Sequence, residues 1–223
     1  FLMGAAKEEK GQRPRVSRET QHTVTLSKGF WLADSTVTQE MWYAVMASSP
    51  SGFTGDSHPV ERVSWYDAQA FIQQLNQRIP GLCARLPSEA EWEYACRAGT
   101  RSPFFAGHDI SPEQVNYDGR YPYLSGKQET YRRKTVPVKS LPCNFWGLYE
   151  MHGNVREWCR DYWLPDLGEE PALDPQGPKK GIYRVVRGGS WASDACFFRS
   201  ACRDRFQTNY CFGSVGIRLA IKR

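Results

Sequence analysis

The sequence lacks several features that would assign a function class directly. None of its seven cysteines forms a Cys-x-x-Cys pair, which argues against a structural zinc site. Lys and Arg form no dense cluster despite a net charge of +5, so we expect no nucleic-acid partner. No apolar stretch is long enough to span a membrane, and no secretory signal opens the chain. Because the chain opens abruptly at FLMG, the missing signal says little about secretion.

Aromatic residues, glycine and proline are plentiful instead. Aromatic residues make up 13% of the chain, which also carries 19 Gly and 14 Pro. So many turn-forming residues are unusual in helix-dominated proteins, and turn signals follow one another from Thr100 to Gly147. The length suits one domain. We therefore predict a single α+β domain over residues 1–223 with extensive irregular loops.

Three segments carry helix-start signals. Thr38 can cap a short helix, while Ser64 with Asp67 and Ser88 with Glu91 match capping boxes. The short strand-like pieces 182–186 and 215–221 frame a C-terminal stretch without periodicity. We also expect Cys83 and Cys96 to be small buried hydrophobes. The side chains expected to face the core are Met41, Trp42, Val45 and Met46 in the first helix, Ala68, Phe71, Ile72 and Leu75 in the second, and Trp92, Ala95 and Cys96 in the third.

Two loops offer oxygen ligands for a hard cation. Glu150 and Glu157 flank a Gly-Asn turn, and calcium takes six to eight oxygens from carboxylates, amides and carbonyls. In the second loop, Asn116, Asp118 and Glu129 can supply further oxygens. From the residues alone, the favoured interpretation of the first loop is a turn whose Asn and Glu side chains bond to backbone amides without a cation. For the second loop it is a solvated, Tyr-rich loop.

Five ordered blocks closely resemble the formylglycine-generating-enzyme (sulfatase-modifying factor) family. They are FLMG, RVSWYDAQAF, RLPSEAEWEYACRAG, GLYEMHGNVREW and RVVRGGSW…GIRLA, and together they extend over nearly the whole chain. The resemblance implies a C-type-lectin-like fold, with a small twisted antiparallel sheet, two main helices and much loop.

The same resemblance implies structural calcium. The first site takes Glu150, Glu157 and the carbonyls of Gly153 and Val155, and the family has Asn where Glu150 stands. A second site takes Asn116, Glu129 and the carbonyls of Tyr117 and Tyr131, with a spacing that differs by a residue from the family pattern.

The family's oxidase chemistry requires two copper-binding thiols after the GGSW block. The matching positions here are Ser193 and Phe198, and neither offers the soft thiolate that Cu(I) prefers. The four histidines are too scattered for the iron site of the sulfoxide-synthase relatives. We therefore expect no catalysis and no copper. The alternative is a copper-dependent oxidase that uses Cys196 and Cys202 in place of the family's pair.

The C-terminal segment also differs from the family in composition. Where family members carry many Asn, this chain has varied residues. An AAC codon whose adenines change while its final C stays cannot encode Lys, Glu, Gln, Met or Trp. From Ala192 to Ser214, only Gln207 lies outside the residues that such codons reach. This pattern resembles the variable proteins of diversity-generating retroelements, including those of Treponema, which copy a template with errors at adenines.

This second resemblance implies a ligand-binding display protein. Its partner is a variable ligand, expected to be a protein, and its place is the cell surface or the extracellular space, with a lipid anchor as one means of attachment. Oligomeric state stays open. Arg199, Arg203, Arg205 and Arg218 are expected to brace the segment. The predicted ligand surface has Trp191 at its base and comprises Ala192, Ser193, Asp194, Cys196, Phe197, Cys202, Asp204, Phe206, Tyr210, Phe212, Gly213 and Ser214.

Two alternatives weigh against that interpretation. Phe198, Phe206 and Phe212 can instead fill the core beneath loops, or the chain can be a structural subunit with one invariant partner. If the variable-surface hypothesis holds, replacing Phe197, Phe206, Tyr210 and Phe212 together by Ser should leave the melting temperature almost unchanged.

Overall fold

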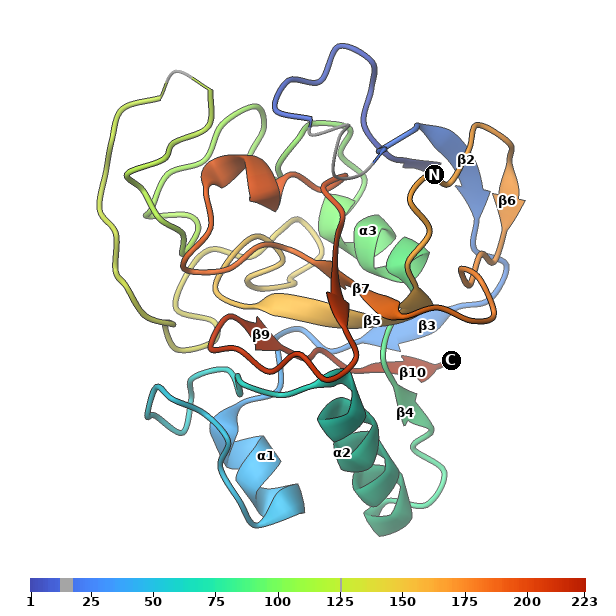
Figure 1. Cartoon of the computed structure of the whole chain (residues 1–223), viewed down its shortest axis with the longest axis vertical. Helices are drawn as coiled ribbons and strands as arrows, with labels where there is room; N and C mark the ends of the chain where they lie inside the picture. The colour runs from blue at the N-terminus through green and yellow to red at the C-terminus, as the bar shows by residue number, and fades with distance from the viewer. Residues whose placement is uncertain (13–17, 125) are drawn as a thin grey trace.

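The computed structural model describes residues 1–12, 18–124 and 126–223 (Figure 1). Short strands, three helices and long loops alternate in this part of the chain, and the helices lie in the first half. They are α1 (Gln39–Met46), α2 (Trp65–Arg78) and α3 (Glu89–Arg97), with a 3₁₀ turn η1 (Ala195–Phe198) near the C-terminus.

A four-stranded sheet forms the centre of the fold. Its order is β8 (Asp204–Gln207), β7 (Tyr183–Arg187), β5 (Arg156–Tyr162) and β9 (Val215–Gly216). β7 runs antiparallel to both neighbours, but β9 pairs with β5 in parallel. The expected small antiparallel sheet is confirmed for β8, β7 and β5, and the edge strand β9 adds a parallel pair because the C-terminal segment returns to β5 in the same direction.

Two three-stranded sheets complete the described structure. In one, β10 (Ala220–Lys222) lies between β3 (Phe30–Leu32) and β4 (Ala84–Arg85). In the other, β2 (His22–Thr25) lies between β1 (Leu2–Met3) and β6 (Ala172–Leu173). The expected strand at 215–221 is thus divided into β9 and β10, which belong to different sheets.

The predicted capping residues begin all three helices. The side chains of Thr38, Ser64 and Ser88 accept backbone N–H bonds, and the last two form complete capping boxes. Two burial predictions are wrong. Met41 is exposed because it lies on the outer side of α1, and Cys83 is exposed in the loop before β4.

Helices cover the sheet region on both sides. In Figure 1, α3 lies above β5 and β7, while α1 and α2 lie below the central sheet. The lower core contains Trp42 stacked on Phe71 at 4.9 Å, together with the fully buried Trp158 of β5. The upper core joins Trp92 of α3 to β5 and β7. These two apolar layers hold the sheet that positions the C-terminal segment.

Candidate functional site

The C-terminal segment crosses the face of the molecule that Figure 1 shows. It leaves β7, turns through η1, runs along β8 and returns at β9 (Figure 1). β7 and β9 both pair with β5, so both ends of the segment are fixed to one strand. We call residues 192–214, which the sequence pattern predicts to vary, the variable segment.

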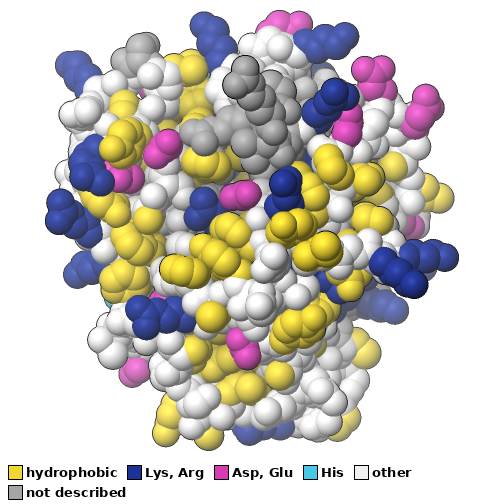
Figure 2. All heavy atoms as spheres, in the orientation of Figure 1, with side chains coloured by type: hydrophobic (Ala, Val, Ile, Leu, Met, Phe, Trp, Pro, Cys, Tyr) yellow, Lys and Arg dark blue, Asp and Glu magenta, His cyan; other side chains and the backbone are white. Residues whose placement is uncertain are grey.

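Three rings of the variable segment form a continuous stack. Phe206 and Tyr210 have ring centroids 3.9 Å apart at 15°, and Tyr210 lies 4.8 Å from Phe212 at 27°. Phe212, at the outer end, is 65% exposed. Figure 2 shows hydrophobic side chains gathered across the middle of this face. We call these three rings the aromatic stack, and its outer end offers a large apolar surface to a ligand.

The inner end of the stack belongs partly to the core. Phe206 and Tyr210 pack against the lower core, and Phe206 meets Trp158 edge-on at 6.2 Å. Phe198 is fully buried beside Tyr117. The core alternative is therefore right for Phe198 and partly right for Phe206, and wrong for Phe212.

Trp191 ties the variable segment to two distant loops. Its Nε1 donates a hydrogen bond of 2.7 Å to the carbonyl of Gly213. Its ring stacks on Tyr131 at 6.2 Å and meets Phe53 edge-on at 5.3 Å. Trp191 is half-buried, so its ring supports this face from below while an edge stays accessible.

Arg156 of β5 lies between the rings of the variable segment. Its guanidinium lies 5.6 Å from the centroids of both Phe197 and Phe206. It also donates to Ser190 Oγ at 2.8 Å, and its Nε lies 3.6 Å from an Asp204 carboxylate oxygen. These contacts hold an arginine with a largely covered side chain in the centre of the face.

The structure corrects two members of the predicted ligand surface. Ser193 and Cys202 are only 5% and 7% exposed, so their side chains lie beneath the surface. Ser193 contacts the Ser190 hydroxyl at 3.0 Å, and its carbonyl accepts the Asp118 N–H. The remaining predicted positions are exposed or half-buried, namely Ala192, Asp194, Cys196, Phe197, Asp204, Phe206, Tyr210, Phe212, Gly213 and Ser214.

Several surface residues of this face were not predicted. Gln207, Asn209 and Cys211 are exposed around the aromatic stack. Their position in β8 and the turn after it could have been found only by recognising β8. Phe53 and Arg156 come from distant parts of the chain, and no sequence pattern links them to residue 206.

Buried arginine–glutamate pairs hold the variable segment from behind. Arg199 bonds both carboxylate oxygens of Glu19 at 2.6 and 2.8 Å, and Arg203 bonds Glu89 in the same way. Arg199 and Arg203 therefore make the ion pairs expected of residues that brace the variable segment. Arg218, beyond the segment, pairs with Glu157, and Arg205 lies 5.0 Å over the Trp163 ring.

The first predicted calcium turn has an incomplete set of hydrogen bonds. Glu150 Oε1 is buried without a hydrogen-bond partner among the described residues, and burial raises the pKa of Glu150 to about 7. Glu157 is already compensated, because Arg218 bonds both its oxygens and Trp92 Nε1 donates to Oε2 at 2.7 Å. The orphaned oxygen of Glu150 is therefore available to a cation, whereas Glu157 would be shared with Arg218.

The second predicted calcium loop contacts the first. Asn116 bridges to Gly153, and its Nδ2 donates to Asn154 Oδ1 at 3.1 Å. Asn116 Oδ1 is buried without a partner in the described structure, whereas Glu129 is exposed. Tyr131 lies opposite Asp118 in an isolated bridge, and the Tyr117 side chain is buried. Of the two side chains in this set, Asn116 combines burial with an unbonded oxygen, and Glu129 does not.

The buried His152 is a satisfied structural residue. Its Nδ1 contacts the Phe198 carbonyl at 2.5 Å and therefore carries the proton, while Nε2 accepts the Phe105 N–H at 3.2 Å. Burial lowers its pKa to about 4, so the ring is neutral at neutral pH. His152 therefore links η1, through Phe198, to the loop that contains Phe105. Both of its ring nitrogens are hydrogen-bonded and neither is free to act in catalysis.

The cysteines form no disulfide, and three of them are deeply buried: Cys96, Cys159 and Cys202. Burial raises the pKa of the Cys202 thiol to about 12, which disfavours the thiolate that Cu(I) requires. Residues 1–12, 18–124 and 126–223 contain no cluster of three or more His, Cys, Asp or Glu side chains able to hold a metal.

A family model described as "Sulfatase-modifying factor enzyme 1-like domain" matches residues 1–223. The chain belongs to this family. The formylglycine-generating enzyme of Streptomyces coelicolor is 37% identical over 180 residues, which make up 76% of this chain and 55% of that protein. The chain thus spans about half the length of this curated relative.

Two solved structures of similar fold align with the whole length of this chain. Treponema denticola variable protein 1 superposes with a TM-score of 0.80 at 29% identity, covering 100% of this chain and 92% of that one. PvdO from Pseudomonas aeruginosa has a TM-score of 0.77 at 26% identity, covering 100% and 91%. The C-type-lectin-like α+β fold and the likeness to a variable protein are therefore confirmed. None of the described helices combines the length and apolarity that crossing a membrane requires.

Proposed function

We propose that this chain is a non-catalytic binding protein whose variable segment is diversified by a retroelement and carries the ligand surface. The main support is the aromatic stack, which ends in an exposed Phe212, in a segment that buried arginine–glutamate pairs hold at other positions. Because the frame uses positions other than the exposed ones, the exposed side chains can change without removing these pairs. The likeness to a treponemal variable protein supports the same proposal.

The ligand that fits this face best is a protein. Aromatic side chains give large contact area at low entropy cost, and arginine and tyrosine are enriched where proteins bind tightly. Arg156 and Asp204 add a polar pair beside Phe206 and Tyr210. The three neighbouring rings form a connected apolar group on the surface, and contiguous apolar patches often mark interaction sites.

Structural calcium is part of the proposal. At the first turn, Glu150, Glu157 and the carbonyls of Gly153 and Val155 would hold the ion, which would supply the missing partner of Glu150 Oε1. At the second, Asn116 would act with Glu129 and the carbonyls of Tyr117 and Tyr131. We further propose display at the cell surface or outside the cell, through a lipid anchor or otherwise, since a diversified binding site is useful where foreign ligands are met.

Sequencing the 3′ end of this gene in many sibling isolates tests the proposal. Differences should concentrate between Ala192 and Ser214, at codon positions where the template repeat carries adenine. The codons for Arg199 and Arg203, whose side chains are buried in ion pairs, should stay constant. If the variable segment proves as constant as the rest of the gene, diversification is excluded.

The oxidase alternative has its own test. We expect no stoichiometric Cu(I) binding under anaerobic titration, because Ser193 and Phe198 occupy the family's thiol positions and Cys202 is buried. Tight equimolar Cu(I) binding that is lost in Cys202→Ser would replace the binding-protein proposal by an enzyme.

A further inference from the structure

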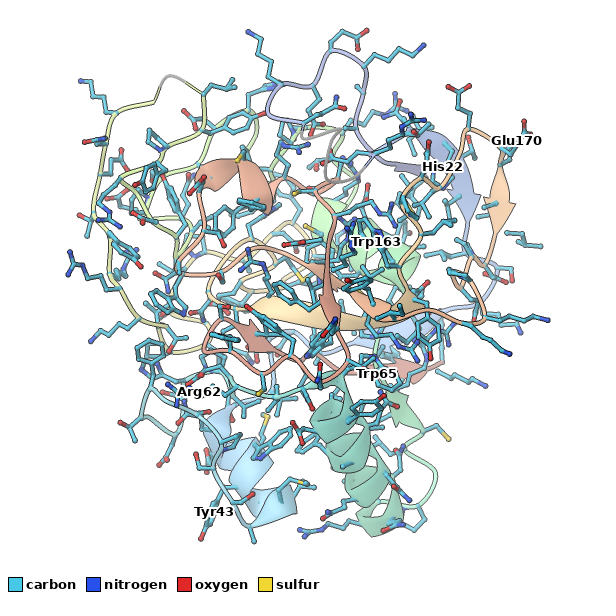
Figure 3. The ribbon with its side chains drawn as sticks, viewed as in Figure 1. His22, Tyr43, Arg62, Trp65, Trp163 and Glu170 are labelled. Carbon is cyan, nitrogen blue, oxygen red and sulfur yellow. The ribbon has the colours of Figure 1, made fainter. Side chains whose placement is uncertain are left out.

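A cavity separate from the variable segment lies between the β2–β6 sheet and the start of α3. Its volume is about 390 Å³, and it shares no lining residue with Ala192–Ser214. Figure 1 shows β2 and β6 beside α3, and Figure 3 labels His22 on β2. Pockets of this size commonly take small organic molecules.

The walls of the cavity are apolar. They come from the N-terminal strand, the start of α3 and the loop on either side of β6, and include Met3, Ala90, Leu164, Leu167, Ala172 and Pro178. Such walls favour a ligand with a hydrocarbon body, because filling them removes apolar surface from water.

Three buried side chains with an acid or imidazole group also line the cavity: His22, Glu89 and Asp161. Glu89 is fully compensated, since Arg203 bonds both its oxygens at 2.6 and 2.8 Å. Asp161 differs. Its Oδ2 accepts the Glu89 N–H at 3.0 Å, but Oδ1 has no hydrogen-bond partner and no basic side chain forms an ion pair with it in the described residues.

Asp161 is therefore an acid that forms no close ion pair among the described residues, although the charges of Arg160 and Arg184 act on it, and it is only 4% exposed. Burial and the neighbouring Glu89 carboxylate raise its pKa to about 7. A buried carboxylate is stable when it is protonated or when a cation meets it. A ligand that brings a positive charge to Oδ1 would replace the proton.

His22 also lines the cavity. Its Nδ1 lies 3.1 Å from the Thr20 carbonyl, which only accepts, so Nδ1 donates to Thr20. Asp161 Oδ1 is an acceptor. A buried carboxylate oxygen in an apolar cavity suits a group that donates hydrogen bonds and carries positive charge, which describes a primary ammonium.

We propose that this cavity binds a small primary amine as its ammonium ion, with the ammonium on Asp161 and the hydrocarbon body against Leu164, Leu167 and Ala172. The site does not depend on the variable segment, so its occupant stays the same when the variable ligand changes.

Isothermal titration calorimetry with cyclohexylmethylammonium chloride tests the proposal. Cyclohexylmethanol is the control ligand, because it has the same body and a hydroxyl in place of the charge. We expect saturable one-to-one binding of the amine and at least about tenfold weaker binding of the alcohol, as the charged hydrogen bond is lost. Equal affinities, or no binding of the amine, would overturn the proposal.

Variants locate the site. Asp161→Asn keeps an acceptor for the Glu89 N–H and should lower amine affinity at least about tenfold. Asp166→Asn, in the loop that follows β5 and paired with the exposed Arg18, should leave it unchanged. Should Asp161→Asn fail to fold, Ala172→Phe takes its place, because it fills the cavity and should abolish binding. The proposal would be contradicted if Ala172→Phe still bound the amine. It would also be contradicted if CaCl2 or ZnCl2, titrated in place of the amine, bound in a way that depended on Asp161.

Discussion

At the residue scale, the two ends of the aromatic stack have different roles. Phe206 touches the lower core and Trp158, while Phe212 projects into solvent. The four-ring replacement by Ser that the sequence suggested would therefore not be neutral. Its effect on stability should come mainly from Phe206, with a smaller share from Tyr210.

Single substitutions separate these roles. Phe206→Ser should lower the free energy of unfolding by about 1–3 kcal/mol, since a partly buried ring is lost from the core. Phe212→Ser should change it by no more than about 0.5 kcal/mol, as most surface substitutions do. Urea denaturation of both variants measures the difference. A destabilising Phe212→Ser would mean that the whole stack supports the fold.

At the element scale, the turn before β5 and the loop around Asn116 each carry one orphaned oxygen, Glu150 Oε1 and Asn116 Oδ1. Gly153 is essential to the shape of the turn, because its φ is +92° and a Cβ there would lie 2.6 Å from the Asn116 carbonyl. The same close approach brings Asn116 beside the Glu150 turn. A cation at this place would therefore stabilise the turn and the loop around Asn116 together.

Calcium should consequently raise thermal stability. We expect a higher melting temperature in calcium than in EDTA, because an ion that binds only the folded chain stabilises it. Glu150→Gln should reduce this difference, since it removes a carboxylate charge from the site. Asp34→Asn, at an exposed surface pair with Lys139, is the matched control and should keep it. Identical melting curves for the native chain in calcium and EDTA would rule out the ion.

At the scale of the whole molecule, buried ion pairs connect the ends of the chain. Arg199 in the variable segment binds Glu9 and Glu19 near the N-terminus, and Arg203 binds Glu89 at the start of α3. Arg187 of β7 binds Glu93 of the same helix. The N-terminal segment, α3 and the variable segment are thus held together by charges that are inaccessible to solvent.

Removing one of these charges should be costly. Arg199→Ala leaves Glu9 and Glu19 buried without their main counter-ion, which should cost about 3–5 kcal/mol of folding free energy. Lys139→Ala breaks only an exposed pair with Asp34 and should cost less than about 1 kcal/mol. Chemical denaturation compares the two variants, and similar small losses would show that the buried network contributes little.

The sequence predicted the parts of this protein that depend on local signals. Ser64 with Asp67 and Ser88 with Glu91 placed two helices, because capping chemistry acts over three residues. β8 was missed, since its residues follow no alternating pattern and it pairs with β7 along one edge only. Ser193 and Cys202 were placed on the surface because a codon pattern carries no information about burial. Neither the contact of Phe53 with Trp191 nor the uncompensated Asp161 could be predicted, because both depend on distant segments meeting.

The attachment of the variable segment to β7 and β9 has a consequence for evolution and for engineering. Both strands flank β5, so the two ends of the segment are separated by two strand spacings, roughly 10 Å. A closed anchor of this kind lets the intervening stretch be exchanged as a cassette while its entry and exit points stay in place. The scaffold can therefore serve as a host for grafted recognition loops, with the buried Phe198 and the ion-paired Arg199 and Arg203 retained in every graft.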